Sequence, residues 1–283
     1  GHTVAIFEAE QSPGGMMRYG IPQYRLPRDT LDSDISRITA MGVELRLGAR
    51  VDDVQRTMQD EGFAACFLGV GSQIGKRAYI PAGDARRITD AVSVLHQMAG
   101  DEKPLLGRRV LVYGGGNTAV DVARTARRLG AEESVIVYRR TRERMPAHDH
   151  EIEEALEEGV KLKWLSTITA ADGEEIKVEK MALDDDGFPQ PTGEFETMQA
   201  DALVLALGQD VELDLLQGIE NLAIDRGTVQ VDPLQHTSHP GIFAGGDMVA
   251  GEKTVTVAVG HGKKAARAIN AYLAGETYTP PPK

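Results

Sequence analysis

Cysteine is almost absent from this chain of 283 residues, in which Cys66 is the only one. A single cysteine cannot form an internal disulfide, and it cannot by itself hold an iron–sulfur cluster or a zinc ion. Cys66 lies within the apolar run FAACFLGVG. We therefore interpret it as a small buried hydrophobic residue, the usual situation of a free cysteine.

Long apolar runs and blocks of basic charge are also lacking. No stretch approaches the roughly 20 apolar residues that span a bilayer, and no signal peptide is evident. We therefore expect a cytoplasmic protein that does not enter a membrane. The formal net charge is −12, and only the arginines near 139 to 144 form a basic group, which argues against nucleic acid as a partner. The run Asp184 to Asp186 fits turn chemistry better than a calcium site, so we expect no metal site.

Glycine is plentiful, with 31 residues, while aromatic residues make up 5% and hydrophobic residues 41% of the chain. This balance is typical of an α/β protein with many tight turns. The length allows about two domains with sizeable cores.

The stretch LVYGGGNTAVDVART, Leu111 to Thr125, has the pattern of a strand, a tight turn and a helix. Its glycines follow the form GxGxxA. Gly114 suits the turn, Gly116 the close approach of a pyrophosphate, and Ala119 the close packing of helix on strand. The pyrophosphate would lie on the free N–H groups at the helix N-terminus, where the helix dipole favours negative charge.

A second apolar strand is predicted over 134–138, and it ends in Arg139 and Arg140. An acidic residue at this place suits the ribose of NAD, whereas arginine suits the 2′-phosphate of NADP. NADPH is therefore the preferred ligand, with NADH left open. The alternative is that the two arginines form a solvated basic strand end.

The first residues, HTVAIF followed by Glu8, look like the second strand of another dinucleotide-binding unit with its ribose-binding acid. The strand and Gly-rich turn that should precede it would lie about 20 residues earlier. We therefore expect the chain to begin part-way into a first nucleotide-binding domain. Alternatively, Glu8 ends an ordinary edge strand.

Periodicity and turn residues predict the remaining elements. A helix follows Asp29, its expected N-cap, and ends at Gly42. Residues 184–194 are interpreted as an exposed loop. The other predicted helices cover 90–98, 148–159 and 254–274, the other predicted strands cover 43–47, 64–70, 202–207, 228–231 and 242–244, and a β-meander is predicted over 161–183.

Several glycines follow predicted strands, namely Gly69, Gly71 and Gly208. Such positions bind ligands in α/β folds, although loop geometry explains them equally well. Asp247 follows a strand and a glycine pair that ends in Gly246, so its carboxylate is placed to accept hydrogen bonds from a ligand hydroxyl. The N-terminus of the helix that begins near Thr254 could face an electron-rich ring oxygen.

Four motifs in this order, GGMMRYGIPQYRLP, GGGNTAVDVART, YRRTRERMPA and GIFAGGDMVAG, resemble the small (β) subunit of NADPH-dependent glutamate synthase and its relatives. The resemblance implies an α/β fold with two Rossmann-like dinucleotide-binding domains, built in three layers with a small β-meander. An FAD domain in two segments, 1–98 and 210–283, would surround an inserted NADPH domain, 99–209.

The same resemblance implies the binding residues. Glu8 would bind the adenosine ribose of FAD, Asp247 its ribityl or pyrophosphate part, and Gly14, Gly15 and Gly20 would line its route. Asp121 fits the family's helix motif, with a structural salt bridge as an equal alternative. The residues that match NADPH positions are Gly114, Gly116, Asn117, Thr118, Ala119, Arg139, Arg140 and Arg144.

The implied activity is transfer of hydride from NADPH to FAD, followed by single-electron transfer to an iron–sulfur-containing domain or subunit. This reaction needs no catalytic acid or base from the protein, because the cofactors carry the chemistry. The FAD fingerprint, the family's N-terminal cysteines and the CxxxxC pair of disulfide reductases are absent from this sequence. Two alternatives therefore stay open: a nucleotide-binding module without turnover, and an NADH-linked relative with another electron acceptor.

Overall fold

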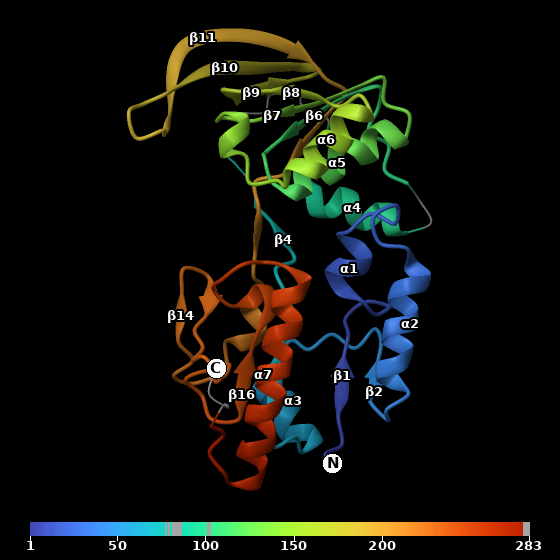
Figure 1. The fold of residues 1–283 in the computed structure, drawn as a ribbon, viewed down its shortest axis with the longest axis vertical. Coiled ribbons are helices and arrows are strands. Elements are labelled where there is room, and N and C mark those ends of the chain that lie inside the picture. Colours follow the sequence, from blue (N-terminus) through green and yellow to red (C-terminus); the bar gives the residue numbers. More distant parts are fainter. Residues whose placement is uncertain (77, 79, 81–86, 101–102, 280–283) are drawn as a thin grey trace. The chain divides into compact units, whose positions relative to one another are not determined.

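The chain crosses four times between two units of structure, at residues 15–16, 32–33, 74–75 and 209–210 (Figure 1). The first unit contains residues 1–15, 33–74 and 210–283, and the second contains 16–32 and 75–209. The structure is a computed structural model that describes residues 1–283 except 77, 79, 81–86, 101–102 and 280–283. We call residues 16–32 the anchor segment.

A five-stranded parallel sheet, in the order β5-β12-β6-β7-β8, forms the centre of the second unit. The register pairs Val112 with Ile136 on one side and with Val204 on the other. The carboxyl ends of β6, β7 and β12 therefore lie at one edge of the sheet. The strands are β5 (Ile88–Asp90), β6 (Arg109–Tyr113), β7 (Glu133–Val137), β8 (Lys161–Lys163) and β12 (Ala202–Leu205).

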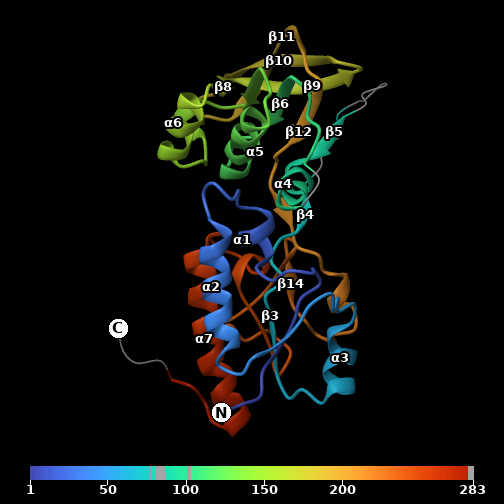
Figure 2. The same cartoon turned by 90° about the vertical axis from the view of Figure 1, so that its right-hand side faces the viewer.

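The second unit has three layers, which Figures 1 and 2 show from two sides. Successive side chains of a strand point to opposite faces, so Val110 and Val112 pack with the helices whereas Leu111 packs with an antiparallel sheet. The helices are α4 (Ala91–Ala99), α5 (Asn117–Arg128) and α6 (Asp149–Glu157), and the antiparallel strands are β9 (Ser166–Asp172), β10 (Glu175–Leu183) and β11 (Pro189–Gln199). The α/β class and the small meander expected from the sequence are confirmed.

The anchor segment folds around the guanidinium of Arg28, which donates hydrogen bonds to four backbone carbonyls of the segment: those of Met17, Arg18, Ile21 and Leu26. Helix α1 (Gly15–Tyr19) begins one residue before the anchor segment. Helix α2 (Arg28–Thr39) begins within the segment and continues beyond it.

Two short parallel pairs form the main sheets of the first unit. β1 (Ala5–Phe7) pairs with β2 (Glu44–Arg46), and β3 (Cys66–Leu68) pairs with β16 (Ile242–Ala244). The 20-residue helix α7 (Val255–Ala274) packs on Phe243 of β16. The remaining elements of the chain are α3 (Val54–Glu61), β4 (Ile74–Gly75), β13 (Gln209–Asp210), β14 (Ile224–Asp225), β15 (Thr228–Val229) and the 3-10 turns η1 (Arg142–Arg144), η2 (Asp214–Leu216) and η3 (Gly246–Met248).

Three local predictions are wrong. The stretch 184–194 is not all loop, because β11 begins at Pro189 and main-chain pairing with β10 outweighs its polar composition. Its prolines are tolerated because β11 is an edge strand. Lys161–Lys163 joins the parallel sheet rather than the meander. Helix α2 begins at Arg28, so Asp29 lies in its first turn and does not cap it.

The expected domain boundaries lie at 98/99 and 209/210. The two compact units also change at 209/210, but not at 98/99. Helix α4 belongs to the second unit because Val94 and Leu95 are part of its core. The anchor segment belongs there as well, because Tyr24 and Arg25 bind α5. Which unit holds which cofactor stays a prediction.

Candidate functional site: the turn after β6 and the edge of β16

Three glycines follow β6, and each has a different surrounding. Gly114 has a φ of +152°, and a Cβ there would overlap the carbonyl oxygen of Ala206 after β12. A Cβ on Gly115 would overlap the ring of Tyr138. A Cβ on Gly116 would meet no described atom within 4 Å. Packing within the protein therefore requires the first two glycines, whereas the third leaves open space where a ligand can approach the backbone.

Gly116 is also the N-cap residue of α5, and no described side chain forms a cap hydrogen bond there. The first N–H groups of a helix lack partners within the helix, and together with the helix dipole they attract anions. The predicted pyrophosphate residues 114–119 run from the glycine turn into the first turn of α5, where Ala119 is fully buried.

The two polar side chains of this turn are already engaged by the protein. Asn117 accepts a hydrogen bond at 3.0 Å from the backbone N–H of His148, the N-cap residue of α6. Thr118 accepts one at 3.2 Å from the side-chain amide of Gln209, next to Gly208. Both contacts use an acceptor oxygen, so the amide N–H groups of Asn117 and the hydroxyl of Thr118 remain donors that, like the backbone N–H groups, can bind an anion.

The predicted 2′-phosphate residues lie at the same edge of the sheet, because β7 runs parallel beside β6. Arg139 is exposed and Arg140 is half-buried. The Nε of Arg140 is buried and has no hydrogen-bond partner among the described residues. A solvated strand end describes Arg139 well, but it does not explain a buried guanidinium nitrogen without an acceptor.

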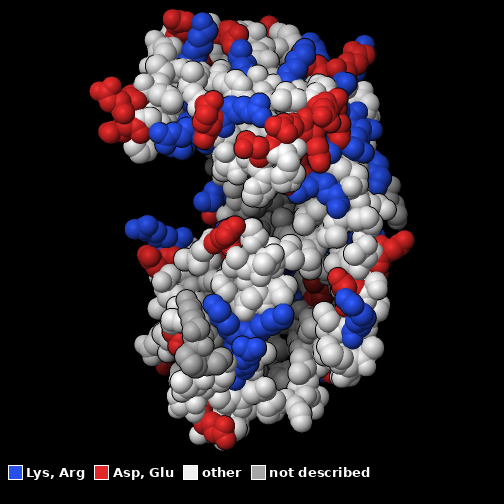
Figure 3. Space-filling view, in the orientation of Figure 1, with Lys and Arg blue, Asp and Glu red and all other residues white. Residues whose placement is uncertain are grey.

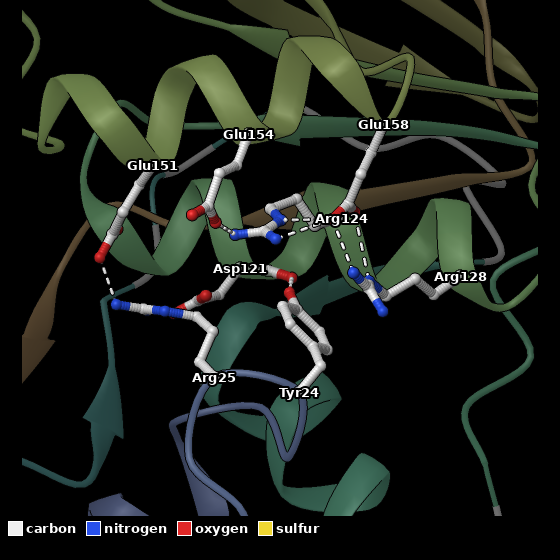
Figure 4. Close-up of polar contacts among 8 residues, drawn as sticks. All are labelled: Tyr24, Arg25, Asp121, Arg124, Arg128, Glu151, Glu154 and Glu158. Carbon is white, nitrogen blue, oxygen red and sulfur yellow. Dashed lines mark hydrogen bonds and ion pairs between the residues drawn. The ribbon is translucent and has the colours of Figure 1, made fainter.

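Asp121 of α5 forms a structural ion pair (Figure 4). Its carboxylate accepts a hydrogen bond at 2.7 Å from Arg25 of the anchor segment, and the same guanidinium binds Glu151 of α6. The side chains of Asp121 and Glu151 are 7% and 3% exposed. Burial raises the pKa of Asp121 to about 6, although Arg25 opposes the shift. One guanidinium thus holds two buried carboxylates that come from two helices, which favours the salt-bridge interpretation of Asp121.

Tyr24 packs beside Arg25, and Figure 4 shows its ring below Arg124 of α5. The guanidinium carbons of Arg124 and Arg128 lie 4.9 and 4.0 Å from the ring centroid. Both guanidiniums bind Glu158 at 2.7 Å. Burial raises the pKa of Tyr24 to about 12. Burial would also raise the pKa of Glu158, but the two arginines hold it below its ordinary value. The anchor segment is thereby fixed to α5.

In the first unit, the parallel pairing of β3 and β16 brings Gly69, Gly71 and Gly246 to one sheet edge. Ser72, which is 1% exposed, donates a hydrogen bond at 3.1 Å to the backbone carbonyl of Asp247 and accepts one at 2.9 Å from Lys253. Burial raises the pKa of the Asp247 carboxyl, and Lys253 opposes the shift. The predicted flavin-binding acid therefore lies on a turn that is held from the neighbouring strand end.

His261 of α7 supports the same turn. Its Nδ1 accepts a hydrogen bond at 3.1 Å from the N–H of Gly246. This contact requires an unprotonated Nδ1. Burial, together with the positive charge of Lys264, lowers the pKa of His261. No sequence pattern predicts this role, because the two residues are joined only through tertiary structure.

We expect this contact to make the stability of the turn depend on pH. Because the folded-state pKa of His261 lies below its unfolded value, the contribution is present above about pH 6.5 and is lost as the pH falls through the folded-state pKa. His261→Asn keeps an acceptor at the position of Nδ1 that does not titrate. The fall in the thermal midpoint between pH 7 and pH 5, measured by circular dichroism, should therefore be larger in the wild type than in His261→Asn. An equal fall would show that His261 does not contribute.

The remaining predicted flavin residues have less uniform surroundings. Glu8 accepts the N–H of Glu10 at 3.0 Å. Gly14 has a φ of +127°. A Cβ on Gly15 would meet no described atom within 4 Å, whereas a Cβ on Gly20 would clash with Met16. Packing therefore explains Gly20 without a ligand. Thr254 caps α7 by accepting the N–H of Val257.

Three other features of the described residues indicate no reactive thiol, no metal site and no membrane span. Burial raises the pKa of Cys66 to about 11, as for a small buried residue rather than a reactive thiol. The described His, Cys, Asp and Glu side chains do not gather in threes that could hold a metal ion. Within the described residues, no helix combines the length and the apolar character needed to cross a bilayer. On the face seen in Figure 3, acidic and basic side chains are interspersed over α5 and α6.

Comparison with known proteins agrees with this geometry. A family model described as pyridine nucleotide-disulphide oxidoreductase matches residues 62–262. The β subunit of an NADP(+)-dependent formate dehydrogenase from Moorella thermoacetica is 39% identical over 297 residues, which cover 99% of this chain and 42% of that protein. A putative NADPH glutamate synthase small chain from Cereibacter sphaeroides is 34% identical, over 97% of this chain and 72% of that protein.

The fold has a counterpart among solved structures. FprA from Mycobacterium tuberculosis, in a His57Gln mutant form, superposes with a TM-score of 0.80 at 18% identity, over 98% of this chain and 80% of that chain. This likeness shows the fold alone. The chain spans less than half the length of the formate dehydrogenase subunit that it resembles. From the extent of the family match, the chain belongs to the pyridine nucleotide-disulphide oxidoreductase family.

Proposed function

We propose that this chain is the part of an oxidoreductase that binds NADPH and FAD and sends electrons from NADPH to an iron–sulfur-containing domain or subunit. The observation that carries the proposal is the open Gly116 at the uncapped start of α5, beside strand β7, which is followed by Arg139 and Arg140. The names of the relatives, a formate dehydrogenase subunit and a glutamate synthase small chain, support a place within a larger enzyme.

The residues present fit both cofactors. NADPH would lie on residues 114–119, with its 2′-phosphate held by Arg139, Arg140 and Arg144. FAD would be held by Glu8, Gly14, Gly15, Asp247 and the start of α7. When bound, the two cofactors supply hydride and electron transfer, and the protein supplies binding and orientation. The N–H groups of α5 offset pyrophosphate charge, and the guanidiniums form charge-assisted hydrogen bonds with phosphate. A cytoplasmic location belongs to the same proposal and is supported by the single cysteine, since disulfides are rare in that compartment.

The colour of the purified protein tests the proposal. A yellow protein whose flavin absorbance bleaches when NADPH is added under nitrogen supports the oxidoreductase. A colourless protein that binds NADPH would instead support a nucleotide-binding module without turnover. A protein that binds neither dinucleotide in a thermal-shift assay would contradict both interpretations.

The two arginines after β7 should set the preference for NADPH. We expect the double variant Arg139→Ala and Arg140→Ala to bind NADPH about a hundredfold more weakly. Each substitution removes a guanidinium and with it a charge-assisted hydrogen bond to the 2′-phosphate worth about 1.5 kcal/mol. NADH, which lacks the 2′-phosphate, should be weakened less than threefold. Arg142→Ala is the control, since Arg142 lies 3.6 Å from Glu153. Equal weakening of both dinucleotides in the double variant, measured by calorimetric titration, would contradict the assignment.

A further inference from the structure

The loop that joins β10 and β11 carries an exposed aromatic side chain. Phe188 is 57% exposed. A single exposed apolar residue is common on protein surfaces and by itself indicates nothing. Phe188 differs because of its neighbours, since the guanidinium carbon of Arg140 lies 5.8 Å from its ring centroid.

The hydrogen bonds of the second unit explain why this loop lies beside the end of β7. The N–H of Leu165 donates to the carbonyl of Arg140, and the N–H of Met181 donates to the carbonyl of Leu165. The last residues of β10 are thereby tied through Leu165 to Arg140, just after β7. Gly187 lies against the guanidinium of Arg144, which a Cβ on Gly187 would touch at 2.9 Å. The loop therefore stands next to two of the three arginines that we assign to the 2′-phosphate.

The loop also has a fixed shape. The carboxylate of Asp184 accepts the backbone N–H of Phe188 at 2.7 Å and that of Asp186 at 3.2 Å. The backbone of Asp184 donates to the carbonyl of Phe188 at 3.0 Å and accepts from Gly187 at 2.9 Å. This is the turn chemistry that the aspartate run predicted. It holds the backbone that carries Phe188, so the loop does not have to be ordered when a ligand binds.

We propose that Phe188 is a specificity-determining residue of the dinucleotide site, on which the adenine ring of NADPH stacks while Arg140 binds the adjoining 2′-phosphate. This inference rests on the proposed function and names the part of the ligand that the β10–β11 loop recognises. An exposed aromatic ring is a stacking platform for a base. A guanidinium beside the ring adds a cation–π contact and a phosphate-binding fork to the same surface.

The test uses ligands that divide NADPH into its two ends. Adenosine 2′,5′-bisphosphate carries the adenine and the 2′-phosphate, and reduced nicotinamide mononucleotide carries neither. We expect Phe188→Ala to bind NADPH and adenosine 2′,5′-bisphosphate about tenfold more weakly, which corresponds to about 1.4 kcal/mol. Binding of reduced nicotinamide mononucleotide should not change. In turnover assays the KM for NADPH should rise while kcat stays constant, as for binding that is uniform along the reaction.

Two further variants make the test specific. Phe195→Ala removes the other large exposed aromatic of the same hairpin, which is 51% exposed and packs with Lys177, and it should bind all ligands as the wild type does. Phe188→Trp should bind adenosine 2′,5′-bisphosphate as tightly as the wild type, and the fluorescence of the new indole should be quenched by it.

The outcomes separate this inference from the proposed function. Wild-type affinity in Phe188→Ala, or equal weakening in Phe195→Ala, would overturn the role of Phe188 while leaving NADPH binding intact. Equal weakening of the two ligand fragments would overturn it as well. A wild-type protein that binds neither NADPH nor adenosine 2′,5′-bisphosphate would overturn the proposed function and this inference with it.

Discussion

Arg25→Ala should lower the unfolding free energy of the second unit by about 3 kcal/mol, the cost of leaving a buried charge without its partner. The guanidinium of Arg25 binds Asp121 and Glu151, whose side chains are 7% and 3% exposed. Urea unfolding can be followed through Trp164, the only tryptophan of the chain, which packs against the core of the second unit. Its fluorescence therefore reports on this unit and not on the first.

The pH dependence of the stability of Arg25→Ala is a second test of the buried ion pair. Burial raises the pKa of Asp121 from 3.8 to about 6. Because the folded-state value is the higher one, Asp121 stabilises the fold below about pH 4, and this contribution is lost as the pH rises through 6. Without Arg25 the pKa should rise further, so the variant should lose more stability than the wild type between pH 5 and pH 8.

Two comparisons control the experiment. Arg108→Ala removes an exposed arginine that pairs with the exposed Glu132, and it should leave the unfolding free energy close to the wild-type value. Adding Asp121→Asn and Glu151→Gln to Arg25→Ala removes the stranded charges and should restore part of the loss. A cost for Arg25→Ala no greater than that for Arg108→Ala would refute the buried-pair account.

Gly116→Asp should abolish NADPH binding while leaving the protein as stable as before or more so. The residue has N-cap geometry with a φ of −88°, and a Cβ there meets no described atom within 4 Å. An aspartate would cap α5 and interact well with its dipole, which adds about 0.5 kcal/mol. The same carboxylate would occupy and repel the phosphate site, so NADPH affinity should fall more than a hundredfold. Retained NADPH affinity would rule out this turn as the dinucleotide site.

Gly114→Ala, unlike Gly116→Asp, should destabilise the protein. Its Cβ would overlap the carbonyl oxygen of Ala206, and alanine is strained at a φ of +152°. We expect a loss of about 3 kcal/mol in Trp164-detected unfolding, the combined cost of overpacking and backbone strain. Gly116→Ser, which caps without adding charge, is the matched control for size. Comparable destabilisation in Gly114→Ala and Gly116→Ser would contradict the surroundings described for the two glycines.

The parts of the fold with strong local signals could be predicted from the sequence. The glycine turn after β6, the helix after Thr254 and the short strand at 242–244 follow from residue patterns that act over a few positions. The strand β11 could not be predicted, because its polar sequence is held by pairing with β10 rather than by its own preferences.

The candidate site also combines residues that belong to local motifs with residues whose partners are distant in sequence. Gly116, which we propose offers its backbone to a ligand, belongs to a local motif that by itself predicts this role. The residues that hold the site in place were missed, because their partners are distant in sequence: Ser72 lies 175 residues from Asp247, and His261 lies 15 residues from Gly246. Arg25 lies in a motif that the sequence comparison used, but the motif did not reveal that its partners are Asp121 and Glu151.

The anchor segment also has a consequence for the order of folding. Arg25 lies 96 residues before Asp121 and 126 residues before Glu151, so it leaves the ribosome long before its partners have been synthesised. Contacts between residues so far apart form slowly, because a long loop has to close before any contact is gained. The sheet, α5 and α6 present the two carboxylates only once they are assembled. Docking of the anchor segment is therefore a late folding event, although the segment is made before α5 and α6.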